Sequence, residues 1–234
     1  MLKPDEIKHR LADLIQDAKP VFPKLASRLD EMRRWIAKKK SGLLTQKVHV
    51  LYLLAELVED ATFWLEVQSL SKDDRELVFA ELSPPERYWY EYLFPAWFNE
   101  EDPKLNVWKQ NLMSGNFQGS DSSYIENICS CIKAEGGFTL NPYVADLSMA
   151  TDFIASGFRD IVLCVQLTTV RNSFSEEKRR NWEFTLQHWG IKRGLFASFN
   201  PGKEQVYVDI GKCVLRNSDD LPDQCYVIWE ESIY

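Results

Sequence analysis

Apolar residues recur every three or four positions through the first part of the chain, which is the period of an amphipathic helix. The pattern predicts one helix over residues 4–19 and a second that ends at Ser41-Gly42. Their apolar faces consist of Ile7, Leu11, Leu14 and Ile15 in the first helix, and of Leu25, Leu29, Met32 and Ile36 in the second. Two amphipathic helices are therefore expected to open the chain.

A longer apolar segment follows and predicts a helix that is buried on most of its sides. Residues 45–70 carry apolar side chains around much of a helical circumference, as in the central helix of a bundle. Ser71 then has the character of an N-cap, because Asp73 and Asp74 follow it in the first turn of a fourth helix. We expect this helix to end at Ser83-Pro84-Pro85.

From residue 121 the pattern changes to short apolar runs. A helix is expected from Asp121 or Ser122 to Gly136-Gly137, where glycine permits the left-handed backbone that ends many helices. Another helix begins at a capping box of Ser173 and Glu176 and ends at His188 or Trp189. The remaining apolar runs predict strands over residues 138–140, 150–155, 161–169, 195–199 and 226–229.

The polar segment Ser114 to Ser120 separates these two patterns and marks a domain boundary. We expect an N-terminal helical domain over residues 1–113 and an α/β domain with a central mixed sheet over residues 121–234. The predicted fold class is therefore α+β. With 45% hydrophobic residues among 234, the chain has ample material for a core.

The formal net charge of −7 is unevenly distributed. Residues 1–45 hold eleven Lys and Arg against six Asp and Glu, which leaves 17 against 29 and a net charge of −12 for the rest. An acidic body argues against broad nonspecific binding of nucleic acid. The basic cluster Arg33 to Lys40 has two interpretations, the solvated end of a helix or a phosphate-binding patch, and the first is favoured.

The five cysteines form no CxxC pair, and the three histidines supply no zinc-ligand spacing. Buried free thiols in a reducing compartment are the expectation. No run of about 18 apolar residues exists, and the N-terminus lacks the apolar core of a signal peptide. We therefore expect a cytoplasmic protein that does not bind membranes.

Seven aromatic residues lie between Tyr88 and Phe98. Such density suits the stacking of bases, but Glu91, Glu100 and Glu101 lie in or next to this segment and it contains no Lys or Arg. Packing between domains or against a partner protein is the favoured interpretation, because large aromatic side chains dominate the energetics of cores and interfaces.

A polar pair interrupts the otherwise apolar strand 161–169. Gln166 and Thr168 point the same way because strand side chains alternate between faces, and Asp152 lies on the preceding strand. A carboxylate and two polar groups are thus expected to converge at one edge of the sheet. Taken alone, the three residues also have plain structural explanations: a turn cap at Asp152, a partner for a buried backbone group at Gln166, and β-branching at Thr168.

The order helix, strand, strand, strand, helix, strand across residues 121–199, together with Asp152 and Gln166, resembles the core of the PD-(D/E)XK nuclease superfamily, the restriction-endonuclease-like fold. In that superfamily an acidic residue on the second strand, an Asp, Glu or Gln on the third, and a Lys two positions later bind a divalent metal and position the attacking water. The resemblance implies that Asp152 and Glu126 hold Mg²⁺ and that Gln166 completes or orients its shell.

Thr168 departs from this pattern, because the superfamily has lysine at that position. The ammonium group would orient the water and offset charge that develops on the phosphate. Some members of the superfamily relocate the lysine, so a basic residue of the next helix is expected to replace it here. Lys178 is the residue that we favour over Arg179 and Arg180.

Two functions follow from these observations. The first is a cytoplasmic nucleic-acid-associated protein that hydrolyses phosphodiester bonds with Mg²⁺, with Asp152, Gln166 and Lys178 as catalytic residues and Asp152 and Glu126 as metal ligands. The second is a noncatalytic module that keeps the fold and binds a protein partner, or forms a homo-oligomer, through its aromatic helical region.

Overall fold

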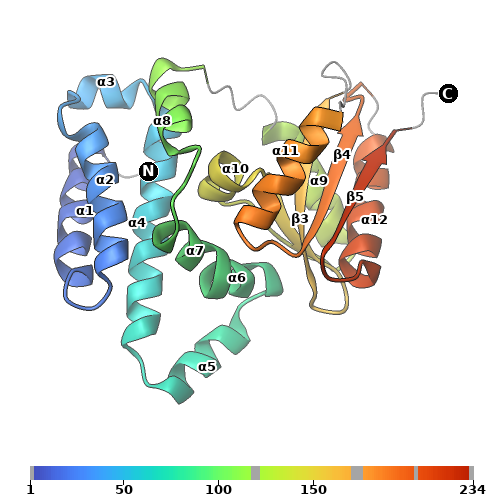
Figure 1. Ribbon diagram of the computed structural model, residues 1–234, viewed down its shortest axis with the longest axis horizontal. Helices are drawn as coiled ribbons and strands as arrows, with labels where there is room; N and C mark the ends of the chain where they lie inside the picture. The colour runs from blue at the N-terminus through green and yellow to red at the C-terminus, as the bar shows by residue number, and fades with distance from the viewer. Residues whose placement is uncertain (1–2, 117–121, 170–175, 203–204, 232–234) are drawn as a thin grey trace. The chain divides into compact units, whose positions relative to one another are not determined.

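The structure is a computed structural model that describes residues 3–116, 122–169, 176–202 and 205–231. It is a mixed α and β protein in which N-terminal helices are followed by a five-stranded mixed sheet, which confirms the expected fold class. The contacts divide the chain into two units (Figure 1). The helical unit is Met1–Leu82 with Tyr90–Gly119, and the sheet unit is Ser83–Trp89 with Ser120–Tyr234. This division differs from the expected one in residues 83–89, which group with the sheet.

Two antiparallel helices open the helical unit, as the apolar pattern predicts. A proline begins each of them, at the first position where a missing N–H costs nothing. A short helix begins at Ser41, where the sequence pattern predicted only the end of the second helix. Ser71 caps the fifth helix by accepting a hydrogen bond from the Asp74 N–H at 3.2 Å. The first five helices are α1 (Pro4–Ala18), α2 (Pro23–Ala37), α3 (Ser41–Thr45), α4 (Val48–Ser69) and α5 (Lys72–Glu81).

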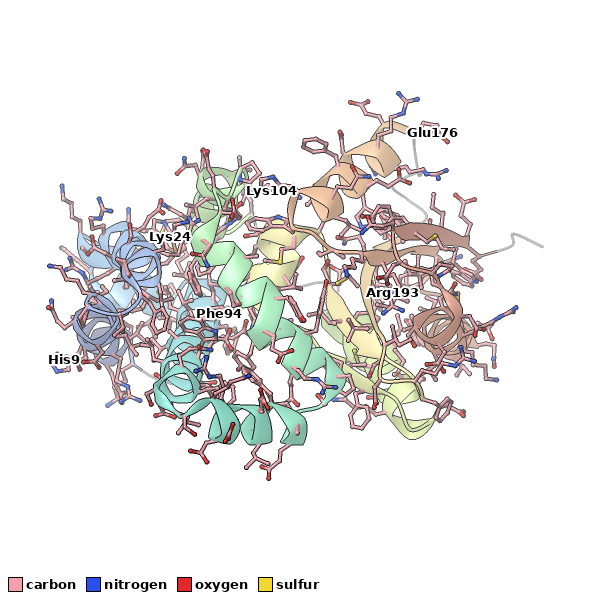
Figure 2. The ribbon with its side chains drawn as sticks, turned by 60° about the horizontal axis from the view of Figure 1, so that its bottom comes forward. His9, Lys24, Phe94, Lys104, Glu176 and Arg193 are labelled. Atoms are coloured by element: carbon pink, nitrogen blue, oxygen red, sulfur yellow. The ribbon has the colours of Figure 1, made fainter. Side chains whose placement is uncertain are left out.

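The aromatic residues from Phe94 to Phe98 form part of the core of the helical unit. Phe94, labelled in Figure 2, contacts the rings of Trp97 and Phe98, and Phe98 contacts Trp64 of α4. Phe94, Trp97 and Phe98 are buried, whereas Tyr92 is 61% exposed. This part of the chain comprises α6 (Pro84–Tyr88), a π-helical turn η1 (Trp89–Leu93) and α7 (Phe94–Asn99), and α8 (Leu105–Ser114) follows.

The sheet of the second unit has the strand order β1-β2-β3-β4-β5. The β1–β2 and β2–β3 pairs are antiparallel, and the β3–β4 and β4–β5 pairs are parallel. The strands are β1 (Phe138–Leu140), β2 (Phe153–Ser156), β3 (Val162–Thr169), β4 (Arg193–Phe199) and β5 (Cys225–Glu230). The helices are α6, α9 (Ser122–Ala134), α10 (Tyr143–Met149), α11 (Glu176–His188) and α12 (Gln205–Asp220).

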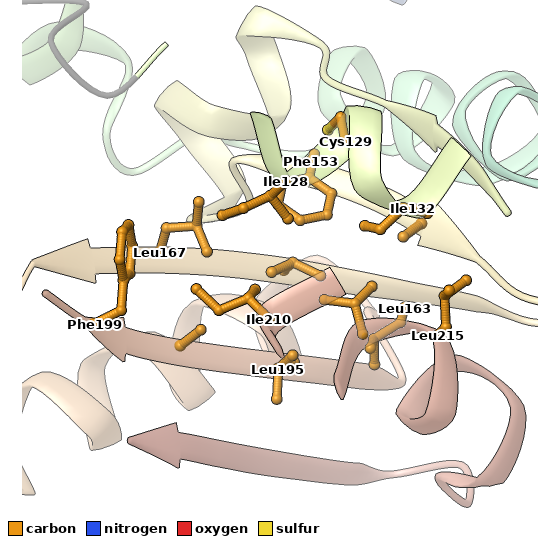
Figure 3. Close-up of a cluster of buried hydrophobic side chains, with 14 of the residues drawn as sticks. Ile128, Cys129, Ile132, Phe153, Leu163, Leu167, Leu195, Phe199, Ile210 and Leu215 are labelled. Carbon is orange, nitrogen blue, oxygen red and sulfur yellow. The ribbon is translucent and has the colours of Figure 1, made fainter. Parts of the chain in front are cut away.

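Helices cover both faces of this sheet. The α9 face is the one on which α9 and α12 pack, and there Ile128 of α9 and Ile210 of α12 join one buried apolar cluster with side chains of the strands (Figure 3). The α11 face is the opposite one, where Trp182 of α11 contacts the rings of Phe196 and Tyr226.

The side chains of β3 alternate between these two faces. Leu163, Val165 and Leu167 belong to the buried cluster on the α9 face. Because successive side chains of a strand point to opposite faces, Cys164, Gln166 and Thr168 point to the α11 face. The two polar residues of this strand therefore lie on the same face, as the sequence pattern predicts.

Three helices of the sheet unit, α6, α10 and α12, were not predicted from the sequence. The seven-residue helix α10 lies between β1 and β2 and is too short for a clear helical period. In contrast, α12 is amphipathic, and its apolar residues Val206, Ile210 and Val214 recur at helical spacing. Arg193 at the start of β4, labelled in Figure 2, ties this helix to the sheet because its Nη1 donates to the carbonyl oxygens of Ser218 and Leu221.

The helices that follow β3 and β4 in the chain pack on opposite faces of the sheet. The chain passes from β3 to α11 on the α11 face, and from β4 to α12 on the α9 face. Both crossovers lead to the next strand on the same side, from β3 to β4 and from β4 to β5. Because their helices pack on opposite faces, one crossover is right-handed and the other left-handed, although nearly all such crossovers are right-handed. The carboxyl ends of β3 and β4, at Thr169 and Phe199, are thus followed by helices on opposite faces, and open α/β sheets bind ligands outside the carboxyl ends of their strands.

Candidate functional site at the carboxyl end of β3

Asp152 and Gln166 meet on the α11 face. Phe153 pairs with Val165, so the antiparallel register sets Asp152, just before β2, opposite Gln166. The Gln166 Nε2 donates a hydrogen bond of 2.8 Å to the Asp152 Oδ2. The structure thus brings together the acid and the amide that the sequence pattern singles out.

The Asp152 carboxylate also has a structural task. Its Oδ2 accepts a second hydrogen bond, of 2.5 Å, from the backbone N–H of Leu167, and its own N–H donates to the Val165 carbonyl oxygen at 2.8 Å. The side chain is only 9% exposed. Hydrogen bonds to a charged acceptor are stronger than those between neutral groups, so Asp152 fastens the start of β2 to β3.

The backbone immediately before Asp152 has an uncommon conformation. Ala150 ends α10 with a φ of 51°, in the left-handed region that residues with a Cβ rarely adopt. The Thr151 N–H then donates to the Ala145 carbonyl oxygen at 3.2 Å, which holds the turn closed. Conformations of this kind cluster at functional sites. Here the turn positions Asp152 on the α11 face.

Lys178 lies on the stripe of α11 that faces the sheet. Trp182 and Leu186, which are buried, follow it at intervals of four residues, and Trp182 packs on Phe196 with ring centroids 5.4 Å apart. Phe196 is in turn the register partner of Gln166. One helical turn rises about 5.4 Å, close to the length of two strand residues, so Lys178 lies near the level of Thr168.

The other two basic residues of the first turns of α11 are placed differently. The Arg179 Nε donates a hydrogen bond of 2.7 Å to the Glu183 carboxylate, which engages it along the helix. This hydrogen bond and, to a smaller extent, the negative charge of Glu183 raise the pKa of Arg179. Arg180 is exposed. Of the three candidates, Lys178 therefore has the best position relative to Gln166 and Thr168.

The structure does not bring Glu126 to this pair. Glu126 is exposed on α9, whose buried residues Ile128 and Ile132 pack on the α9 face, whereas Asp152 points to the α11 face. In the described ranges, no group of three or more His, Cys, Asp or Glu residues is arranged to hold a metal ion. The expected pairing of Glu126 with Asp152 is thus replaced by the contact between Asp152 and Gln166.

Ser198 is a polar neighbour that the sequence analysis missed. It is the register partner of Thr168, so two hydroxyl groups lie side by side on the α11 face at the carboxyl ends of β3 and β4. Ser198 is 7% exposed. The only signal in the sequence was a single serine inside the apolar run Leu195 to Phe199. Its partner Thr168 becomes known only from the register between β3 and β4.

The part of β3 immediately before Gln166 is buried on the α11 face as well. Cys164 lies two residues before Gln166 on the same face, and burial raises the pKa of its thiol to about 12, against the smaller lowering effects of a hydrogen bond with Thr151 and of the charge of Arg193. Electrostatic interactions are stronger in such a low-dielectric environment than in water. Electrostatic interactions at the carboxyl end of β3 are therefore strengthened by the buried, apolar part of the sheet next to it.

Comparisons with known proteins add no identification. No protein-family model, curated protein or solved structure matches this chain.

The arrangement suits the binding of a phosphate group together with a cation. Asp152 supplies a carboxylate, Gln166 an amide oxygen, and Thr168 and Ser198 supply hydroxyl groups, all on one face. Mg²⁺ usually binds proteins through one or two carboxylates and fills its shell with water and substrate phosphate. Lys178 adds a positive charge from the neighbouring helix.

Proposed function

We propose that the sheet unit binds nucleic acid and hydrolyses its phosphodiester bonds with Mg²⁺ at the carboxyl ends of β3 and β4. The contact of 2.8 Å between Gln166 Nε2 and Asp152 Oδ2 is the observation that carries this function, because it joins the two residues that the PD-(D/E)XK resemblance singles out. The order of α9, β1, β2, β3, α11 and β4, with the short helix α10 inserted between β1 and β2, supports it as well.

Each residue has a defined role in this function. The Asp152 carboxylate and the Gln166 amide oxygen are the protein groups that would hold the cation, which would polarise the phosphate and acidify a bound water. The Lys178 ammonium orients the attacking water and offsets the charge that develops on the phosphate. Thr168 and Ser198 donate hydrogen bonds to phosphate oxygens.

A cytoplasmic location belongs to the same proposal. The five cysteines are free thiols, as is usual for proteins of reducing compartments. Among the described residues, no helix is long and apolar enough to cross a membrane.

Cleavage assays with matched variants test the proposed activity. Purified protein is incubated with single-stranded and double-stranded DNA and RNA, with Mg²⁺, with Mn²⁺ or with EDTA. The key variant is Asp152→Asn, because an amide oxygen still accepts the Leu167 N–H while the negative charge is lost. We expect cleavage that depends on the metal and that falls at least about 100-fold in Asp152→Asn. Equal cleavage by Asp152→Asn and the wild type would reject the assignment.

A noncatalytic function is the second candidate, and one observation favours it. Two donors of the protein itself, the Leu167 N–H and the Gln166 amide, share the Asp152 Oδ2, as expected for a purely structural clamp. The unit would then bind a protein partner without hydrolysis. Thermal unfolding distinguishes the two candidates, since a structural clamp predicts no Mg²⁺-dependent or Mn²⁺-dependent rise in the melting temperature.

A further inference from the structure

The strand β5 forms one edge of the sheet and offers unpaired backbone groups. Its inner edge pairs with β4, and in the described part of the chain no strand pairs with its outer edge. The Glu231 N–H donates to the Ser198 carbonyl oxygen at 3.0 Å. In a parallel ladder alternate residues bond to the same neighbour, so Cys225, Val227 and Trp229 also bond toward β4. The N–H and C=O groups of Tyr226, Ile228 and Glu230 therefore point outward.

This edge has few of the devices by which proteins usually prevent strand addition, the exposed Glu230 being its one charged residue. Its sequence, Cys-Tyr-Val-Ile-Trp-Glu, contains no proline, lysine or glycine, and five of its six residues are half-buried. The opposite edge of the sheet, β1, has three residues and is protected by its shortness. The two edges differ, and only β5 is long enough to template another strand of similar length.

We propose that β5 pairs with β5 of a second copy of this chain, antiparallel and about a two-fold axis at Ile228. In this register Ile228 meets Ile228 of the partner subunit, and Tyr226 meets Glu230 of the partner subunit. Each outward residue then exchanges both of its backbone hydrogen bonds. The two sheets join into one continuous sheet of two copies, which removes both β5 edges.

The side chains of β5 are complementary in this register. Val227 lies opposite Trp229 of the partner subunit, a β-branched and aromatic pair of the kind that stabilises antiparallel strands. The charges also agree, because each Glu230 carboxylate faces a tyrosine. An axis at Glu230 would instead oppose the two carboxylates. A closed two-fold contact is the commonest form of homo-oligomer, and this strand is its own complement.

Sedimentation equilibrium of the full chain tests the pairing, with Ile228→Pro and Ile228→Ala as matched variants. Proline at position 228 removes an outward N–H but no hydrogen bond to β4, and edge strands tolerate it at such positions. Alanine keeps the N–H. We expect the wild type and Ile228→Ala to have twice the monomer mass of 27.3 kDa, and Ile228→Pro to have the monomer mass. A monomeric wild type, or a dimeric Ile228→Pro, would overturn the pairing.

Hydrogen exchange provides a readout that does not depend on a variant. The pairing predicts slow exchange at the amides of Tyr226, Ile228 and Glu230, with protection that decreases at least about tenfold as dilution dissociates the dimer. An unpaired edge predicts fast exchange at these three amides at every concentration, beside slow exchange at Val227 and Trp229. Neither result depends on hydrolytic activity.

Discussion

The α9 face and the α11 face of the sheet are built from the same strands but have different chemistry. On β3 and β4 the α9 face carries mainly apolar side chains, which pack with α9 and α12 in one buried cluster, and Arg193 at the start of β4 donates hydrogen bonds to carbonyl oxygens of Ser218 and Leu221. On the α11 face, Gln166, Thr168 and Ser198 replace apolar residues toward the carboxyl ends of the same strands. Because side chains alternate between the two faces of a strand, one face stabilises the fold while the other carries polar groups. We therefore expect substitutions on the α9 face to change mainly stability and substitutions of the polar residues on the α11 face to change activity as well.

The largest loss of stability is expected from a substitution on the α9 face. Leu195 is fully buried in the apolar cluster, so Leu195→Ala removes packing atoms and leaves a cavity. We expect a loss of about 3 kcal/mol in the free energy of unfolding. Urea denaturation followed by circular dichroism measures it. A loss below about 1 kcal/mol would indicate that this face is not the main source of stability.

The next effect concerns the charge of Lys178. Lys178→Met keeps the length of the side chain but removes the ammonium group, and we expect cleavage to slow about 100-fold, which corresponds to about 2.7 kcal/mol in the activation free energy. Arg180→Met, which removes an equally exposed charge off the stripe of Trp182 and Leu186, is the control and should retain the wild-type rate. Equal losses in both variants would remove Lys178 from the site. Thr168→Lys, combined with Lys178→Met, should restore part of the rate.

A smaller effect is expected when the clamp on the α11 face is removed. Asp152→Ala leaves the Leu167 N–H and the Gln166 amide without their acceptor, which should cost about 2 kcal/mol of unfolding free energy. Asp152→Asn should cost less, because it keeps an acceptor. Urea denaturation of both variants checks this order. The structural role of Asp152 is contradicted if Asp152→Ala is as stable as the wild type.

A further effect is a dependence of stability on alkaline pH. Burial raises the pKa of Cys164 from 9.0 to about 12, so the folded protein holds this proton more tightly than the unfolded chain. The resulting stabilisation is complete below pH 9.0 and is lost as the pH rises toward 12. In urea titrations from pH 8 to 11 (about the range in which the unfolded thiol ionises), the wild type should lose more stability than Cys164→Ala. Parallel losses would contradict the burial of this thiol.

Much of the sheet unit follows from local sequence patterns. Short apolar runs bounded by turn residues locate β2, β3 and β4, and the strand side-chain rule places Gln166 and Thr168 on one face. The contact of Gln166 with Asp152 needs one further fact, the register of the β2–β3 pair. A short turn between the two strands favours that register but does not determine it.

Other features required tertiary information or were overlooked. The aromatic residues Phe94, Trp97 and Phe98 are as compatible with an interface as with a core until their ring contacts are seen. Glu126 was a different case, because it lies off the apolar stripe of its helix and the sequence already placed it on the exposed side. The position of Ser198 beside Thr168 depends on a parallel pairing between strands that lie 30 residues apart.

The most direct test of the polar α11 face is a titration with paramagnetic Mn²⁺ observed by nuclear magnetic resonance. If Asp152 and Gln166 hold a divalent cation, the side-chain amide signal of Gln166 should broaden first, and Asp152→Asn should abolish the broadening while the protein remains folded. The backbone amide of Glu126 on α9 should remain sharp at the same Mn²⁺ concentration. Broadening at Glu126 with a sharp Gln166 signal, or no selective broadening at all, would contradict the account.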